Sequence, residues 1–344
     1  MAPLIFIHYG PARYVQWTLE TARRSNPDKR IVLLGDSSNR QLVPAGVDFY
    51  EFESLAGKNE ELEFQRIFQV VKGARHRFSK THGVEFWLKF VFRRWFLIRS
   101  FLENKEIDAF WTFDSDTLCL ANLAARETRY ADVEATTQCR DQCLNGWVGS
   151  RDLVVRYTQS ILDQFEDPAF LDAQRDRLNV HAGLAFNEMD AFMEFRRRDN
   201  IKTQYGEEQR GSEIFDDALA FGNAFEVSQA KVLGRTPIKR IWTDGNSIFA
   251  RKKESGKFVR LLTCNMSWMP DYMWRRLIAA ARGGGIESRG TGAEGSIREE
   301  NLREISLREP VVDCILNQAK LAVFKMRGVL REGLATKRHE NTRK

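Results

Sequence analysis

The sequence predicts an α/β protein in which helices flank a mixed, mostly parallel sheet. Three observations support this fold class. Segments rich in β-forming residues alternate with helical segments through the first 113 residues, polar side chains follow three of the expected strands, and shorter β segments continue to about residue 282. Strands separated by helices of this length are typical of right-handed βαβ crossovers, which build parallel sheets.

The first 113 residues supply the alternating part of the pattern. The expected elements are strands at 4–8, 29–36, 47–52 and 109–113, and helices at 12–25, 59–79 and 85–103. In sheets of this kind, ligands gather at the carboxyl ends of the strands. His8, Asp36 and Asp114 stand at such ends, so they are the first candidates for a functional site.

Residues 133–282 show a mixed pattern without an internal repeat. Ser150 is expected to cap a helix that runs to about residue 165, because a serine oxygen can accept a hydrogen bond from the first helical turn. Residues 211–225, GSEIFDDALAFGNAF, predict a further helix. Short strands are expected in DVEATTQC, LNGWVGS, FEVSQ, IKRIW, NSIFA and KFVRLLTC.

The chain is expected to divide into a domain at 1–282, a linker at 283–300 and a tail at 301–344. The linker carries six glycines and almost nothing that a core would bury. In the tail, apolar residues recur at helical spacing with lysines and arginines between them. This pattern predicts a basic amphipathic helix that either packs on the domain or lies on an anionic membrane surface; a disordered tail is the third alternative.

The positive charge is concentrated at the C-terminal end. From Lys320 onward, eight lysines and arginines face two glutamates, and this excess equals the net charge of the whole chain, +6. Residues 1–319 are therefore neutral together. Because nucleic-acid-binding proteins usually carry their positive charge on the folded domain, we expect no nucleic-acid partner.

Several features predict a cytoplasmic protein, peripheral on the inner face of the membrane if the tail binds lipid. No run of eighteen apolar residues occurs, and the N-terminus lacks the basic and apolar regions of a signal peptide. Five scattered cysteines suggest free thiols in a reducing compartment. Cys139 and Cys143 stand four residues apart with no second pair nearby, so we expect no zinc site, because closed tetrahedral sites need four ligands.

The segment AFWTFDSD carries the strongest chemical signal. An aromatic strand at 109–113 runs directly into Asp114 and Asp116. Two carboxylates at this spacing converge on one cation only if the backbone bends there. Magnesium or manganese typically bridges such carboxylates to substrate phosphates and stabilises a diphosphate leaving group. The pattern therefore indicates nucleotide-diphosphate chemistry, although a D-x-D on a turn is also common in a purely structural role.

The flanking segments fit a site at this position. The helix before the strand carries Arg93, Arg94 and Arg99, from which a guanidinium could reach a phosphate or an aspartate. After the pair, TLCLANL is apolar again, as expected of a metal-binding loop that leads back into the interior.

With these motifs in this order, the sequence resembles the GT-A fold glycosyltransferases, nucleotide-sugar-dependent enzymes with a Rossmann-like sheet and a D-x-D metal motif. The similar segments are IFIHYGPARYVQWTLETARRSNPDKRIVLLGD, RRWFLIRSFLENKEIDAFWTFDSDTLCLANL, CLNGWVGSRDLVVRYTQSIL and GSEIFDDALAF, within residues 3–282. The resemblance implies transfer of a sugar from a nucleotide-diphosphate donor, with uridine as the base, to a saccharide or lipid-linked acceptor in polysaccharide biosynthesis.

The resemblance also implies roles for single residues. Asp114 and Asp116 would bind the manganese or magnesium ion and, together with Ser115, the donor. The other donor-binding residues would be His8, Tyr9, Gly35, Asp36 and Arg94, and those facing the donor sugar or the acceptor would be Asn145 and Gly146. From its sequence position alone, His8 is equally well explained as a packed histidine.

One departure from the family concerns the metal. Many relatives carry a late histidine as a third ligand, but the matching stretch RLLTCNMSW at 260–268 has none. Asn265, Cys264 or a water would have to replace it, and cysteine is a poor ligand for magnesium or manganese. The sequence therefore leaves metal dependence open.

The predicted catalytic residues are Glu213 and Asp217. An inverting transferase needs a general base for the acceptor hydroxyl, and on a helix at 211–225 Glu213, Asp216 and Asp217 would share one face. Glu213 also falls where the resembling enzymes place an acidic residue near the acceptor. A solvated acidic helix face is the alternative, and a retaining enzyme needs no such base.

Other classes fit the sequence less well. A phosphatase with an aspartyl nucleophile also uses a strand-end D-x-D, usually near the N-terminus and followed by glycine and threonine. A sugar nucleotidyltransferase usually opens with a glycine-rich basic loop, which HYGPARY does not provide. A non-catalytic scaffold held at a membrane by its tail is the remaining alternative.

Overall fold

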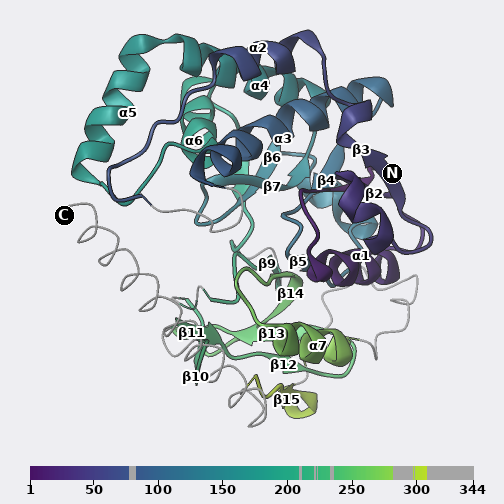
Figure 1. The fold of residues 1–344 in the computed structure, drawn as a ribbon. Helices are drawn as coiled ribbons and strands as arrows, with labels where there is room; N and C mark the ends of the chain where they lie inside the picture. The colour runs from purple at the N-terminus through teal and green to yellow at the C-terminus, as the bar shows by residue number, and fades with distance from the viewer. Residues whose placement is uncertain are drawn as a thin grey trace, which may run out of the picture.

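The fold is a mixed α/β architecture, as the sequence predicts. The computed structural model describes residues 1–76, 83–208, 211–220, 222, 224–232, 236–281, 297 and 299–307. A large sheet with its covering helices forms the upper part of Figure 1, and a smaller sheet with helix α7 forms the lower part.

The large sheet has seven strands in the order β3-β2-β1-β4-β7-β6-β8. Their bounds are β1 Leu4–His8, β2 Ile31–Gly35, β3 Asp48–Glu51, β4 Phe110–Thr112, β6 Ala135–Gln138, β7 Cys143–Val148 and β8 Thr203–Tyr205. Strands β3, β2, β1 and β4 are parallel, β7 is antiparallel to both of its neighbours, and β8 is parallel to β6. The central sheet is therefore mostly parallel.

Alternating side chains of the large sheet bury both of its faces. Ile5 and Ile7 of β1 point into one core with α2, α3, α4 and α6, whereas Leu4 and Phe6 point into another with α1. The helices on this sheet are α1 Arg13–Ser25, α2 Asn59–Ile67, α3 Val84–Asn104, α4 Arg151–Glu166, α5 Pro168–Val180 and α6 Glu188–Arg198, with 3₁₀ turns η1 Ser37–Leu42, η2 Phe52–Ser54 and η3 Ala124–Tyr130.

The smaller sheet follows the order β15-β12-β13-β14-β5, and β9 pairs with β14 in parallel. Its bounds are β5 Thr117–Cys119, β9 Glu213–Phe215, β12 Trp242–Thr243, β13 Ile248–Arg251, β14 Phe258–Asn265 and β15 Arg303–Glu304; beside it lie the hairpin β10 Val227–Val232 and β11 Thr236–Lys239, helix α7 Asp271–Ala280 and turn η5 Glu299–Asn301. Trp274 and Leu277 of α7 belong to the same hydrophobic core as Ile248 and Leu261 of the sheet.

The chain passes from the large sheet to the small one at the D-x-D segment. Strand β4 ends at Thr112 and β5 begins at Thr117, where it pairs with Asn265 of β14. The return of the chain into apolar surroundings is also present, because Leu118 and Cys119 are fully buried.

Most elements expected in the first half are confirmed. The strands at the start of the chain and the helices α1 and α3 lie within a few residues of their expected bounds. Ser150 caps α4 as expected, because its Oγ accepts a hydrogen bond from the Leu153 N–H at 3.3 Å. The helix expected at 59–79 is shorter, since α2 ends at Ile67, and α5, α6 and α7 were not predicted.

The helix predicted for residues 211–225 is wrong. Glu213–Phe215 is strand β9, which pairs in parallel with β14, and Ile214 and Phe215 are each 1% exposed. The free β14 edge and the burial of these two side chains outweigh the helical spacing of the acids. Glu213, Asp216 and Asp217 therefore do not share a helix face.

Little of the predicted tail belongs to the described residues. Arg303–Glu304 is extended and pairs with β12, and Leu307 is buried in the core of the small sheet. The basic amphipathic helix, which was expected mostly beyond this point, and most of the glycine-rich linker lie outside the described residues. None of the described helices combines the length and the apolar character that crossing a bilayer requires.

Candidate functional site

The D-x-D segment forms a tight bend. The Thr117 N–H donates to the Asp114 carbonyl oxygen at 2.9 Å, which closes a turn over the two aspartates. The bend lies beside the carboxyl end of β1, because Ser115 Oγ is 2.8 Å from His8 Nδ1. The structure thus supplies the bend that two carboxylates at this spacing need in order to converge.

Asp114 is held from two sides. Arg94 of α3 donates from Nη1 to Asp114 Oδ1 at 2.8 Å, and Asn145 of β7 donates from Nδ2 to Oδ2 at 3.3 Å. The other arm of Arg94 binds Glu188 at 3.1 Å. Burial opposes the charge of Arg94, but Asp114 and Glu188 outweigh it and raise the pKa of the guanidinium. The arginine thus reaches an aspartate, one of the two contacts expected from the sequence.

Asp116 carries an unsatisfied oxygen. Its Oδ2 accepts a hydrogen bond from Ser267 Oγ at 2.7 Å, whereas Oδ1 is buried without a hydrogen-bond partner among the described residues. Burial, with the charge of Asp114 as a second cause, raises the pKa of Asp116 to about 6. A buried acceptor without a donor is costly, so this oxygen is poised for a ligand.

The late stretch at 260–268 approaches the aspartates through a residue that the sequence analysis missed. Ser267 contacts the Asp116 carboxylate, and its backbone N–H donates to Asn265 Oδ1 at 2.9 Å. Cys264 is fully buried, with Sγ 3.7 Å from Met266 Sδ. The sequence analysis named Asn265 and Cys264 as replacements for the missing histidine. No local pattern indicated that Ser267 would contact Asp116.

His8 is a buried, neutral histidine. It is 8% exposed, burial lowers its pKa to about 4, and its Nε2 has no hydrogen-bond partner in the described structure. The Tyr14 ring meets it edge-on at 5.5 Å and stacks on Trp274 at 5.4 Å. Burial raises the pKa of Tyr14 to about 12, with the nearby Asp116 as a second cause. Tyr14 was also missed, because an aromatic residue on a helix usually signals core packing.

The end of β2 supports the loop that follows β1. Asp36 caps η1 by accepting from the Ser38 N–H at 2.8 Å and also accepts from the Gly10 N–H at 2.5 Å. Burial would raise the pKa of Asp36, but its contacts with Ser38, the side chain first, and with the Gly10 N–H outweigh burial and lower the pKa. Gly35 leaves the space that Asn39 Oδ1 occupies. Both predicted residues therefore shape the edge of the site.

The other predicted donor and sugar residues lie on neighbouring elements. Tyr9 packs against the rings of Phe86 and Phe90, with centroids 4.7 and 5.7 Å away. Asn145 is 2% exposed and contacts Asp114, as described above. Gly146 has a φ of +95°, and a Cβ there would overlap Thr136 Oγ1. Tight packing is thus a sufficient reason for this glycine.

Glu213 lies in a cluster of arginines. Its carboxylate binds Arg126 at 2.5 Å and Arg129 at 2.6 Å, and Arg260 approaches to 3.5 Å. Burial would raise the pKa of Glu213, but the arginines outweigh it and lower the pKa. In the described structure, the carboxylate forms no bond to the D-x-D residues. Its assignment as a catalytic base stays a prediction.

Asp217 connects to the turn between β6 and β7. Its Oδ2 accepts hydrogen bonds from the Tyr205 hydroxyl at 2.7 Å and from the Arg140 N–H at 2.5 Å, while Oδ1 is buried without a partner among the described residues. Burial raises the pKa of Asp217. The neighbouring Asp216 is fully buried against Lys239 at 2.5 Å. Of the two predicted catalytic residues, Asp217 has the more weakly neutralised carboxylate.

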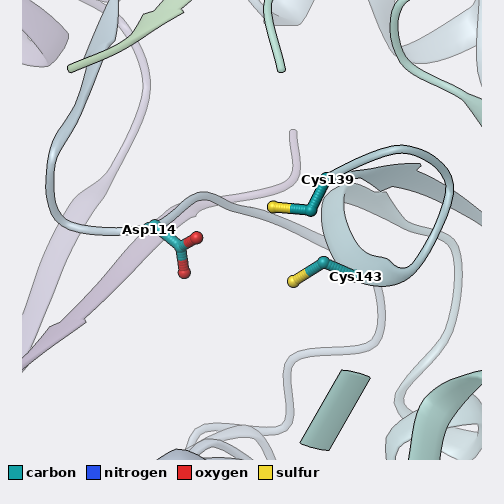
Figure 2. A group of neighbouring side chains, drawn as sticks. All are labelled: Asp114, Cys139 and Cys143. Atoms are coloured by element: carbon teal, nitrogen blue, oxygen red, sulfur yellow. The ribbon is translucent and has the colours of Figure 1, made fainter. Parts of the chain in front are cut away.

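Two cysteines lie next to Asp114. The sulfurs of Cys139 and Cys143 and a carboxylate oxygen of Asp114 all lie within 4.8 Å of one another. In Figure 2 both thiols lie on the side of the turn that faces the Asp114 carboxylate. The sequence showed the two cysteines but not their third neighbour, because the contact depends on the pairing of β7 with β4.

The comparisons with known proteins add little to this description. No family model matches the sequence. No curated protein matches it either. Among solved structures, the chain is similar to the galactosyltransferase LgtC in complex with donor and acceptor sugar analogs, at 12% identity over 59% of this chain and 73% of that chain, with a TM-score of 0.28. A likeness this low supports no statement about the site.

Proposed function

We propose that this protein is a glycosyltransferase that takes a sugar from a nucleotide-diphosphate donor. The observation that carries the proposal is the bend at Asp114 and Asp116, where Asp116 presents a buried oxygen without a partner and has a pKa raised to about 6. Perturbed carboxylates at the carboxyl ends of parallel strands are typical of ligand sites. The D-x-D resemblance adds the substrate class, with uridine diphosphate as the carrier.

The residues present fit a magnesium or manganese ion. Asp116 offers its free oxygen, and Asp114 offers a carboxylate whose contact with Asn145, at 3.3 Å, is long for a hydrogen bond to an ionised group. The ion would neutralise the donor diphosphate as it becomes the leaving group. Ser267, which follows the end of β14, orients Asp116 in the region where the resembling enzymes place a histidine ligand.

The remaining donor-site residues orient and enclose the nucleotide in this proposal. Arg94 fixes Asp114 and adds positive charge at the buried end of the carboxylate. His8 stays neutral near pH 7, since its pKa is about 4. Its contact with Ser115 Oγ positions that serine. Tyr9 lines the nucleotide base. Gly35 and Asp36 support the loop at Gly10, whose N–H donates to Asp36.

On the acceptor side, Asn145 and Gly146 face the transferred sugar, and Asp217 takes the proton of the acceptor hydroxyl. Asp217 suits a base because its pKa is raised and one oxygen is free. The acceptor is a saccharide or a lipid-linked saccharide, as the resemblance implies. Glu213, which is neutralised by arginines, is better suited to holding β9 in place.

Calorimetric titration of a panel of nucleotide-sugars, with and without manganese, tests the proposal. The wild type is expected to bind one uridine-diphosphate sugar in a manganese-dependent way, and Asp116→Asn and Asp116→Ala are expected to lose this binding. Asp172→Asn is the matched control, because the Asp172 side chain is 70% exposed on α5. Donor binding that does not require manganese would support the transferase function but contradict the role of the metal. No binding to any donor would contradict the whole proposal.

A further inference from the structure

The turn between β6 and β7 has an unusual backbone. Cys139, Arg140 and Asp141 have φ angles of +54°, +60° and +67°, so three successive non-glycine residues are left-handed. Each such residue costs about 1 kcal/mol or more. Such strain persists only where the surroundings enforce it.

Side-chain contacts hold the strained turn. Thr137 Oγ1 donates to Asp141 Oδ1 at 2.5 Å, and Arg196 binds the same carboxylate at 2.6 Å. Asp217 accepts from the Arg140 N–H, as described above. These contacts come from three elements outside the turn or at its edge. In the turn that they hold, the sulfur of Cys139 lies within 4.8 Å of the sulfur of Cys143, the first residue of β7.

The same arrangement places both thiols at the D-x-D bend. Strand β7 pairs antiparallel with β4, with Gly146 opposite Thr112, so the start of β7 projects past the end of β4 to Asp114. The three ligand atoms lie within 4.8 Å of one another, and they point toward a common region in Figure 2. Two thiols and a carboxylate at this separation can approach one ion with only small side-chain movements.

We propose that Asp114, Cys139 and Cys143 bind a thiophilic divalent cation of the zinc class. Thiolate sulfur is a soft ligand that selects zinc or cobalt over magnesium and manganese. Three protein ligands leave one tetrahedral position open, which is typical of zinc sites that accept a further ligand from solvent or substrate. This proposal departs from the sequence analysis, which predicted no zinc site because only two cysteines were near each other; the fold adds Asp114 as a third candidate ligand.

Charge balance favours such an ion at this place. Arg94 carries one positive charge between the carboxylates of Asp114 and Glu188. A divalent ion that binds two thiols displaces both of their protons, so two positive charges enter with the ion and two leave as protons. The net charge of this poorly solvated region stays the same. A hard cation bound without an anionic donor would leave the thiols protonated and add two charges there.

The site shares Asp114 with the donor site proposed above. A thiophilic ion would therefore compete with manganese-dependent donor binding. This consequence depends on the proposed transferase function, whereas the metal site itself does not.

Cobalt titration tests the metal site without any donor. The wild type is expected to bind one Co²⁺ with a sulfur-to-cobalt charge-transfer band and intense tetrahedral d–d bands, and added Zn²⁺ should abolish both. Cys139→Ser and Cys143→Ser should each lose the charge-transfer intensity. The control is Cys264→Ala, because Cys264 Sγ lies against Met266 in the core of the small sheet. Cys139→Gly keeps the left-handed backbone and tests the ligand if the serine variant does not fold.

The outcomes separate this proposal from the transferase. A cobalt spectrum without sulfur bands, or one that folded Cys139 and Cys143 variants retain, would overturn the metal site. Calorimetry in buffers of different ionisation enthalpy should show the release of about two protons for each ion. If zinc binds in this way but leaves manganese-dependent donor binding unchanged, the proposed competition is wrong but the proposed metal site is supported. If no donor binds at all, the cobalt result still decides the metal site.

Discussion

Asp116 is a side chain whose burial costs the ligand-free protein stability. It is an ionisable group without a partner for one buried oxygen, next to a second carboxylate. Native proteins seldom leave such groups unsatisfied unless a ligand completes them. The carboxylate should therefore destabilise the ligand-free protein, whereas in the proposed function it binds the metal ion.

We expect Asp116→Asn to stabilise the ligand-free protein at pH 8 by up to about 3 kcal/mol, from the pKa shift between 3.8 and about 6. Because the pKa is raised in the folded state, the destabilising effect of the carboxylate is complete above pH 6 and disappears below pH 4. The stabilisation should shrink accordingly across this window. Urea denaturation at several pH values measures it, with Asp172→Asn as the control. A variant less stable than the wild type at pH 8 would contradict the expectation.

The same pKa predicts the pH dependence of donor binding. If binding requires ionised Asp116, the affinity should fall about tenfold for each pH unit below 6, and His8 should not contribute above pH 5 because its pKa is about 4. Ser267 lowers the pKa of Asp116 through its hydrogen bond. In Ser267→Ala the midpoint should therefore move to higher pH, which calorimetric dissociation constants between pH 5 and 8 would reveal. An unchanged midpoint would show that another group controls binding.

At the scale of single elements, β7 carries much of the site. It supplies Cys143, Asn145 and Gly146, and its backbone passes so close to β6 that Gly146 has no room for a Cβ. The glycine was predicted as a sugar contact from resemblance, yet the structure gives it a packing role as well. The packing role can be tested by its effect on stability.

We expect Gly146→Ala to destabilise the protein by about 2–4 kcal/mol, because alanine is strained at a φ of +95° and its Cβ would overlap Thr136 Oγ1. In a Thr136→Ala background the overlap disappears, so the additional loss should fall to about 1 kcal/mol. Denaturant unfolding of the four proteins in this double-mutant cycle measures both parts. Equal losses in the two backgrounds would remove the steric explanation.

Strand β9 provides the second test at this scale. Glu213→Gln should destabilise the protein by about 2 kcal/mol, because it leaves Arg126 and Arg129 without their carboxylate in a half-buried setting. The turnover of the proposed sugar transfer by the folded variant should change little.

Asp217→Asn should show the opposite pattern: its stability should change little, and its turnover in sugar transfer should fall a hundredfold or more. If Glu213→Gln abolishes turnover without loss of stability, Glu213 is the base.

At the scale of the whole molecule, the separation of charge predicts a membrane contact. The chain is neutral before Lys320, and its six excess positive charges lie beyond that point. A protein truncated after residue 307 keeps β15 and the buried Leu307. We expect the full chain to co-sediment with anionic vesicles at low salt and the truncated protein to lose this binding. Neutral vesicles are the control. Equal binding of the full chain and the truncated protein to anionic vesicles would show that the tail does not mediate membrane contact.

Local patterns account for the parts of the fold that the sequence predicted well. The strand LIFIH and the helix that follows it are defined by residues close together in the chain, and Ser150 marks a helix start through its own side chain. The failure at 211–225 has the opposite cause. Glu213–Phe215 becomes a strand because β14 offers it a partner edge, and no nearby residue encodes that edge.

By itself, the sequence determined the mostly parallel sheet, the place of Asp114 and Asp116 at a strand end, and the basic character of the C-terminal tail. Each of these depends on composition or on residues that are neighbours in the chain. Only the tertiary structure decided that Ser267 meets Asp116 and that Cys139 and Cys143 meet Asp114. The pairing of β5 with β14 and of β4 with β7 creates these contacts between distant segments, and local periodicity carries no information about such pairings.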